Sequence, residues 1–120
     1  MRRGGSIVNT ASVAAYSGSA DSISFSSANG AIVSFTRSLS LSLASQGIRV
    51  NGVAPGTIGT PLIGLSAPDE PIAERGEGVP MNRVSHPYEV APAYVFLASD
   101  DLSYISGQII HVNGGRIVNG

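Results

Sequence analysis

Three short runs rich in β-branched residues alternate with two longer helical stretches along this chain of 120 residues. The predicted strands are Ser6–Ala11, Ile48–Val53 and Gln108–Val112, and the predicted helices are Phe25–Ala44 and Tyr88–Ser99. Short apolar runs that are bounded by Gly or Pro are typical of buried strands. Strands that alternate with helices form a parallel sheet with right-handed crossovers. The sequence therefore predicts one α/β domain over residues 1–120, in which helices flank three parallel strands.

The helix predicted over Phe25–Ala44 has two distinct faces. Apolar side chains recur along it at steps of three and four residues, as Phe25, Ala28, Ile32, Phe35, Leu39 and Leu43. A second face carries small residues, namely Ser26, Ser27, Gly30, Ala31, Ser34 and Ser38. Asp21 or Ser24 can cap its start and Gly47 can end it. The small face predicts close packing against another helix.

Two long segments between these elements are predicted to be mostly loop. The first is Ser12–Ser24, which is rich in Ser, Ala and Gly, and the second is Thr57–Arg83, which holds four of the seven prolines. Long loops in small domains often carry function. The second segment contains the acidic cluster Asp69, Glu70, Glu74 and Glu77.

The composition excludes several classes of site. All seven basic residues are Arg and there is no Cys, so lysine Schiff bases, P-loops, cysteine nucleophiles and thiolate metal sites are excluded. The two histidines, His86 and His111, are too far apart in sequence for a typical zinc motif. A net charge of -1 argues against nucleic acid or an anionic membrane as a partner. No apolar run is long enough for a secretion signal or a membrane helix, and we expect a cytoplasmic protein.

Several stretches together resemble a known family. These are IVNTAS, GIRVNGVAPGTIGTPL, MNRVSHPYEVAPAYVFLAS and SYISGQIIHVNGG. In order and spacing they are similar to the C-terminal half of a short-chain dehydrogenase/reductase. The resemblance covers nearly the whole chain. It implies a Rossmann-like fold, here truncated, a nicotinamide dinucleotide and hydride transfer to or from a carbonyl group.

The resemblance also implies roles for individual residues. Ser12 stands where the family has the serine that hydrogen-bonds the substrate oxygen. Pro55, Gly56, Ile58 and Thr60 match the segment that lies against the nicotinamide and the pyrophosphate. In that segment the glycine backbone allows close approach of the cofactor, and the Thr60 hydroxyl can donate to phosphate.

The family's catalytic pair is absent. The resemblance places the tyrosine of Tyr-x-x-x-Lys at Phe25 and the lysine, which also holds the ribose of the cofactor, at Asn29. In the family the ammonium lowers the pKa of the tyrosine, and the tyrosine moves the proton. Phe25 has no proton to give and Asn29 has no charge. We therefore expect little dehydrogenase activity, and Tyr16 is a weak candidate for a substitute acid.

The chain also lacks the family's glycine-rich G-x-G-x-x-G turn, which seats the pyrophosphate on a helix N-terminus. NAD(P) is thus implied by resemblance alone, and we expect no high-affinity cofactor. Without a further strand beside Ser6–Ala11, that edge of the sheet is left unpaired. We expect a homo-oligomer, a dimer, a tetramer or larger, that completes the fold through residues 25–44, with residues 88–112 as a second candidate interface.

Three functions remain open at this stage. The first is a truncated relative of the dehydrogenases without their activity. The second is a small hydrolase, either an esterase that uses Ser12 with His86 as base, or a glycosidase that uses two carboxylates of the acidic cluster. The third is a half-fold that pairs with a separate N-terminal half. No metal site is predicted in any of them.

Overall fold

Three parallel strands form the centre of the computed structural model, which describes residues 1, 3–66, 69–71 and 74–117. The strands are β1 (Ser6–Thr10), β2 (Arg49–Pro55) and β3 (Ile109–Val112), in the order β1-β2-β3. Val8 pairs with Asn51, and Val53 pairs with Ile110. The α/β class and the three parallel strands are confirmed. Among the described strands, β1 has a neighbour on one side only, as the sequence predicts.

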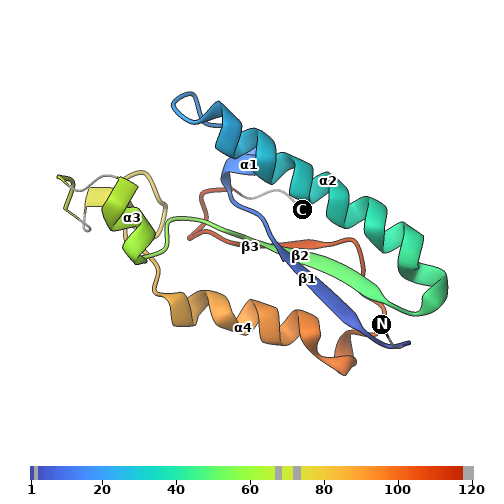
Figure 1. The fold of residues 1–120 in the computed structure, drawn as a ribbon. Coiled ribbons are helices and arrows are strands. Elements are labelled where there is room, and N and C mark those ends of the chain that lie inside the picture. Colours follow the sequence, from blue (N-terminus) through green and yellow to red (C-terminus); the bar gives the residue numbers. More distant parts are fainter. Residues whose placement is uncertain (2, 67–68, 72–73, 118–120) are drawn as a thin grey trace.

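One long helix covers each face of the sheet (Figure 1). The helices are α2 (Ile23–Leu43) and α4 (Pro87–Ala98). Val33 of α2 packs on Ala11 and Ala54, and Val90 and Leu97 of α4 pack around Val53 on the other side. Successive residues of a strand point to opposite faces of the sheet. Ala54 of β2 is therefore buried under α2, and Val53 is buried under α4.

The buried face of α2 differs from the predicted apolar stripe. Its buried residues are Asn29, Val33, Thr36 and Ser40, whereas Phe25 and Phe35 are half exposed. The small polar residues can lie against the sheet because they bond within the helix. Thr36 donates to the Ile32 carbonyl and also accepts from Asn9 of β1. The aromatic side chains of α2 are thereby left on the outer surface.

Both predicted loops contain helical turns. The first holds α1 (Ala14–Ser17), and the second holds α3 (Pro61–Ser66) and a 3₁₀ turn at Glu74–Gly76. The predicted caps of the long helix are wrong at its start, where Ser22 is the N-cap and makes no capping bond with its side chain. At the other end, a 3₁₀ turn over Ala44–Gln46 ends at Gly47, whose φ of 66° is left-handed.

Arg49 joins the sheet to the end of α4. Its side chain is buried, and its two terminal nitrogens donate to the carbonyls of Leu97 and Ser99 at 3.0 and 2.9 Å. A cation at the C-terminus of a helix satisfies carbonyls that have no partner within the helix. A 3₁₀ turn over Asp100–Leu102 then leads toward β3. Within the described residues, the helices are too short or too polar to cross a membrane.

Candidate functional site

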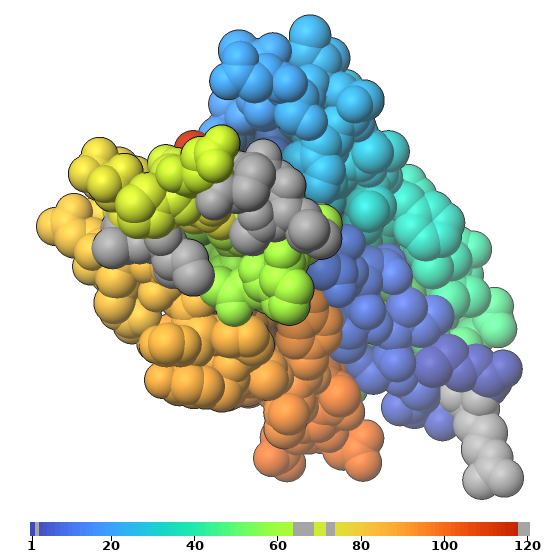
Figure 2. Space-filling model, turned by 60° about the vertical axis from the view of Figure 1, so that its left-hand side comes forward, coloured from blue at the N-terminus to red at the C-terminus, as the bar shows by residue number. Residues whose placement is uncertain are grey.

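A cavity of about 650 Å³ opens at the carboxyl ends of β1 and β2. Figure 2 shows the two walls, where the yellow-green segment after β2 stands beside the blue residues at the start of α2. Residues from both walls line the cavity, among them Ser12, Phe25, Gly56, Thr57, Ile58, Thr60, Glu70, Glu74 and Glu77. In parallel α/β sheets, ligands bind at this edge. This cavity is therefore the candidate site.

Ser12 is fixed at the rim of the cavity by backbone pairing on either side. The Ala11 N–H donates to Val53 and the Val13 N–H donates to Pro55, at 2.8 and 2.9 Å. The Ser12 Oγ accepts a bond from the Ala14 N–H at 3.2 Å, which starts α1. Because Oγ already accepts from this donor, its own proton is available to a ligand oxygen. Ser12 is thus placed as a hydrogen-bond donor, as the resemblance implies.

Phe25 and Asn29 lie one turn apart on α2 and have different surroundings. Phe25 is 50% exposed and lines the cavity together with Ser12. Asn29 is only 8% exposed, and its Nδ2 donates to the Phe25 carbonyl at 2.9 Å. The expected cofactor contact of Asn29 is therefore not supported, since its amide bonds to its own helix. Phe25 lines the same cavity as Ser12, at the position where the resemblance places the family's tyrosine.

The segment that follows β2 is held by a short pairing with residues before α4. Ile58 and Ser85 form an isolated parallel β-bridge. The Gly59 N–H donates to the Ser85 carbonyl at 2.8 Å, and the Ser85 N–H donates to the Thr57 carbonyl at 3.1 Å. The Thr60 N–H donates to the Ile58 carbonyl, so these amides are already paired within the chain. Thr60 is among the residues that line the cavity.

Gly56 is required by the protein's own packing. A Cβ atom built there would lie 2.8 Å from the Asn113 Cα, which is backbone and cannot swing aside. Packing against Asn113 is thus enough to require glycine here, and the approach of a cofactor to the Gly56 backbone stays a prediction. Asn113 itself fixes the turn after β3, where its Oδ1 accepts from the Gly115 N–H at 3.0 Å.

Three of the four predicted carboxylates reach the cavity. Glu70, Glu74 and Glu77 line it, whereas Asp69 is not among its lining residues. Arg75 holds this acidic segment in place, because its guanidinium donates to the carbonyls of Ile63 and Glu70 and lies 3.8 Å from the Glu70 carboxylate. The structure thus brings Ser12 and three carboxylates to one cavity.

The histidines and Tyr16 do not join Ser12. His86 is the N-cap of α4 and its ring stacks on Tyr88 at 5.1 Å, outside the lining of the cavity. The predicted pairing of Ser12 with His86 is therefore not supported. Tyr16 lies on α1 rather than on a loop, and it packs edge-to-face against His111. Burial raises the pKa of Tyr16, which argues against its use as a substitute acid.

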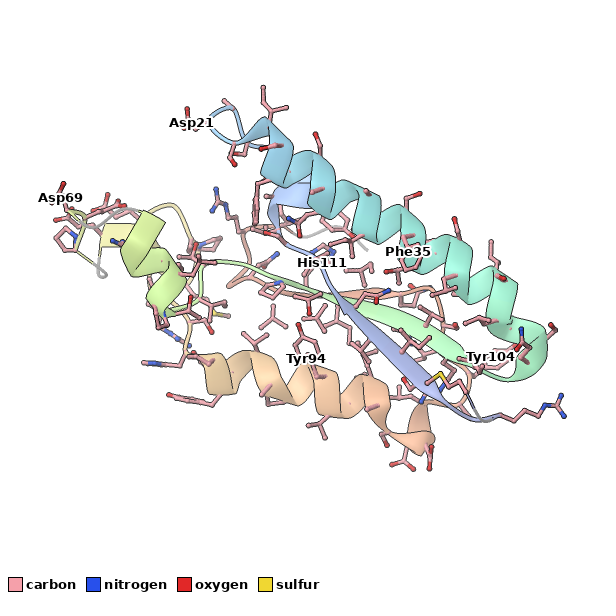
Figure 3. The ribbon with its side chains drawn as sticks, in the orientation of Figure 1. Asp21, Phe35, Asp69, Tyr94, Tyr104 and His111 are labelled. Carbon is pink, nitrogen blue, oxygen red and sulfur yellow. The ribbon has the colours of Figure 1, made fainter. Side chains whose placement is uncertain are left out.

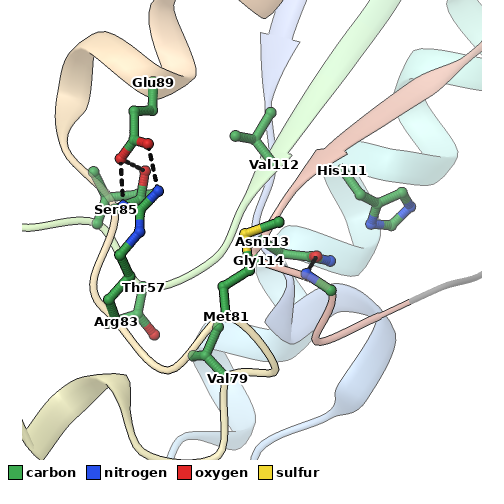
Figure 4. A pocket seen from close by; sticks show the side chains of 12 residues that line it. Thr57, Val79, Met81, Arg83, Ser85, Glu89, His111, Val112, Asn113 and Gly114 are labelled. Atoms are coloured by element: carbon green, nitrogen blue, oxygen red, sulfur yellow. Dashed lines mark hydrogen bonds and ion pairs between the residues drawn. The ribbon is translucent and has the colours of Figure 1, made fainter.

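A second cavity, of about 340 Å³, lies beside the end of β3 and was not predicted (Figure 4). On its wall the Arg83 guanidinium and the Glu89 carboxylate form a two-pronged ion pair at 2.8 and 2.6 Å. Glu89 also accepts from the His86 N–H at 2.8 Å and so completes the start of α4. Pro87 followed two residues later by an acid was the sequence signal for this helix start.

The Arg83–Glu89 pair gives a pH dependence that can be measured. Hydrogen bonds from Arg83 lower the pKa of Glu89 to about 2, from an ordinary value of 4.5. A depressed carboxyl pKa contributes stability above pH 4.5, and that stability is lost as the pH falls toward 2. We expect the urea midpoint of the Glu89→Gln variant to fall less over this interval than that of the unmodified chain. Equal slopes would contradict the assignment, and Asp21→Asn, at an exposed carboxylate, serves as the control.

Comparison with known proteins agrees with this fold and site. The sequence pattern of a family described as Enoyl-(Acyl carrier protein) reductase matches residues 1–116. A solved short-chain dehydrogenase/reductase of the glucose/ribitol dehydrogenase type from Brucella melitensis superposes with a TM-score of 0.89 at 38% identity, over 99% of this chain and 48% of that one. The chain belongs to the short-chain dehydrogenase/reductase family.

Curated relatives of this short-chain dehydrogenase/reductase are closer in sequence. It is 58% identical to a glucose and ribitol dehydrogenase of Daucus carota over the whole chain, and that match covers 41% of the carrot protein. It is 55% identical to the NADPH-dependent aldehyde reductase 1 of Arabidopsis thaliana, over 99% of this chain and 42% of that protein. The chain thus spans about two fifths of the length of these relatives.

The residues present fit the family's dinucleotide only in part. The Ile58 and Thr60 segment offers an apolar side chain and a hydroxyl to the cavity. At the position of the family's lysine, however, the Asn29 amide is buried and bonded to Phe25. It carries no charge, and one of its two N–H donors is already used within the helix. The described groups at Phe25 and Asn29 therefore do not fit the cofactor as the family holds it.

Proposed function

We propose that this chain is a short-chain dehydrogenase/reductase segment that has kept the substrate-facing wall of the site and lost the family's hydride-transfer activity. One observation carries the proposal: Phe25 occupies the cavity wall beside Ser12, where the family has its acid. Ser12 still offers a hydrogen bond to a ligand oxygen. It cannot by itself deliver the proton that a reduced carbonyl needs.

The size of the expected loss follows from the chemistry. A positioned general acid contributes about 10²–10⁴-fold to a rate. The phenyl ring of Phe25 carries no exchangeable proton, and the Asn29 amide cannot tune a neighbouring pKa by charge. Weak binding of the nicotinamide end along residues 55–60 remains part of the proposal, without turnover.

The test is a pair of measurements on the purified chain. NADH and NADPH are titrated to millimolar levels and nicotinamide fluorescence is followed. Oxidation of either cofactor is then measured with aldehydes and with sugars, the substrate types in the names of the relatives. We expect weak or no binding and no turnover above the uncatalysed rate. Turnover at a rate typical of the family would overturn the proposal.

A second candidate function is glycoside hydrolysis by the acidic segment. It is favoured by one observation, namely that Glu70, Glu74 and Glu77 line the same cavity as Ser12. Glycosidases use two carboxyl groups on either side of the scissile bond. Release of nitrophenol from nitrophenyl glycosides tests it, and the activity must be lost in Glu74→Gln or Glu77→Gln. An esterase built on Ser12 and His86 has no comparable support.

We also propose that the chain assembles, either with copies of itself or with a separate N-terminal half. The outer side of α2 supports this, because Phe35 is 56% and Leu41 81% exposed there. The outer edge of β1 offers backbone groups that another strand can pair with. The apolar outer side of α4, with Tyr88 and Val95, is a candidate for a second interface.

The two modes of assembly are separated by mass. Light scattering on the purified chain at several concentrations distinguishes a dimer or larger oligomer from a monomer. Phe35→Asp is expected to dissociate an assembly that uses α2, whereas Met81→Asp, at an exposed residue outside both candidate interfaces, is the control. A monomer that forms a one-to-one complex with the N-terminal part of the carrot relative would favour the half-fold. A monomer that neither self-associates nor binds this N-terminal part would contradict both modes of assembly.

A further inference from the structure

The large cavity presents apolar side chains on both of its walls. On the wall formed by α2 the Phe25 ring is half exposed, and on the wall formed by α3 the Leu62 side chain is 72% exposed. Ile58 also lines the cavity, in the segment that leads from β2 to α3. Large apolar side chains that meet at a cavity form a binding surface, because a ligand can still remove them from water. The walls therefore suit an apolar group of a ligand.

One hydrogen-bond donor faces the same cavity. The Ser12 Oγ accepts from the Ala14 N–H, so its proton is available to an oxygen of a ligand. A carbonyl or hydroxyl oxygen can accept this bond. The cavity, of about 650 Å³, is within the range that holds small organic ligands. Ser12 thus selects an acceptor oxygen on the ligand, and the apolar walls select what carries that oxygen.

The charges around the cavity disfavour an anionic ligand. Among the described residues that line it, three are carboxylates, at positions 70, 74 and 77, and two are guanidiniums, Arg75 and Arg116. Arg75 lies 3.8 Å from the Glu70 carboxylate, which leaves two carboxylates against the guanidinium of Arg116. A ligand with a carboxylate or phosphate group would meet this excess of negative charge, whereas a neutral ligand would not.

We propose that Phe25 is a specificity-determining residue, and that the cavity binds a neutral compound in which an apolar ring carries a carbonyl or hydroxyl group. The ring lies against Phe25 and Leu62, and the oxygen accepts a hydrogen bond from Ser12. This inference rests on the proposed function, because it gives the phenyl ring of Phe25 a binding role at the position where the family has its proton donor.

An aromatic ring on the ligand strengthens the contact with Phe25. Pairs of aromatic rings attract each other beyond the effect of the area that they bury. Glucose, by contrast, carries hydroxyl groups around its ring, and each of them needs a polar partner when it leaves water. Phe25, Leu62 and Ile58 offer none through their side chains. The proposal therefore predicts that an aromatic ketone binds better than a sugar of similar size.

Titration of the isotope-labelled chain with acetophenone, followed by NMR, tests the proposal. The Ala14 amide should shift, because its N–H donates to the Ser12 Oγ. The methyl protons of Leu62 should shift through the ring current of the ligand. A dissociation constant of about 1 mM is expected for so small a ligand. Glucose and benzoate should bind severalfold more weakly. No saturable shift up to about 10 mM acetophenone, or equal binding of glucose or benzoate, would overturn the proposal.

Variants show whether the Phe25 ring and the Ser12 hydroxyl make these contacts. Phe25→Ala should weaken the binding of acetophenone by about two- to tenfold, and Phe25→Tyr should recover it because the ring is restored. Ser12→Ala should weaken it by about two- to tenfold, as the loss of one hydrogen bond predicts. Phe35→Ala is the matched control, since Phe35 is a half-exposed ring further along α2, away from the end that borders the cavity (Figure 3). Equal effects of Phe25→Ala and Phe35→Ala would contradict the role of Phe25.

This experiment can fail independently of the proposed function. The titration contains no NADH or NADPH, so it measures binding alone and no turnover enters the result. Absence of acetophenone binding would overturn the role of Phe25 and leave the loss of hydride transfer standing. Cofactor oxidation at a rate typical of the family would overturn the proposed function, whatever the titration shows.

Discussion

Replacing Phe25 by Tyr and Asn29 by Lys in one chain is expected to raise kcat/KM for NAD(P)H-dependent carbonyl reduction by about 10²–10⁴-fold. Phe25 already lines the cavity with Ser12, so a phenol at this position places an acidic proton at the right wall. One turn further along, the lysine replaces an amide that donates to the Phe25 carbonyl. Its ammonium would lower the pKa of the new tyrosine.

Kinetics are measured at millimolar cofactor on the chain alone, and again with the N-terminal part of the carrot relative added. Phe35→Tyr is the matched control, because it adds a phenol to the exposed side of the same helix. Ser12→Ala in the double variant should remove most of the gain. A folded double variant that is no more active than the parent under both conditions would show that Phe25 and Asn29 are not what limits the reaction.

The sequence predicted the architecture well because its strongest signals are local. The three β-branched runs and the length of the helices follow from residue periodicity and glycine positions, and their ends shifted by only one or two residues. The buried face of α2 could not be predicted in this way. Asn29, Thr36 and Ser40 can be buried because their side chains bond carbonyls of their own helix, and a pattern of hydrophobic residues does not register this local pairing.

The sequence could indicate site residues that belong to one local motif. It could not indicate contacts between residues that lie far apart in the chain. The resemblance singled out Ser12 and Phe25, and both line the cavity. It could not show that the space beside Gly56 is filled by Asn113, which lies 57 residues later in the chain. The Tyr16–His111 contact is likewise a product of the fold, because 95 residues separate the two side chains.

A loss of stability is expected when Asn51 is replaced, a residue that has no assigned function. Asn51 is fully buried in β2, where its Oδ1 accepts from the Gln108 N–H and its Nδ2 donates to the Ile105 carbonyl, each at 3.0 Å. These two bonds fix the turn that leads into β3. Asn51→Leu keeps the number and branching of the side-chain heavy atoms and leaves both backbone groups without their partner. We expect unfolding to become easier by about 2–4 kcal/mol.

Urea unfolding followed by circular dichroism measures the effect of Asn51→Leu, with the slope checked so that a change in midpoint reflects stability. Gln108→Ala is the matched control, since it removes an exposed side chain and keeps the N–H that Asn51 binds. That variant should stay within about 0.5 kcal/mol of the parent. If Asn51→Leu were equally stable, the two Asn51 bonds would not be what fixes the turn before β3, and the backbone pairing of β2 with β3 and the apolar packing of Ile109 and Ile110 would be sufficient.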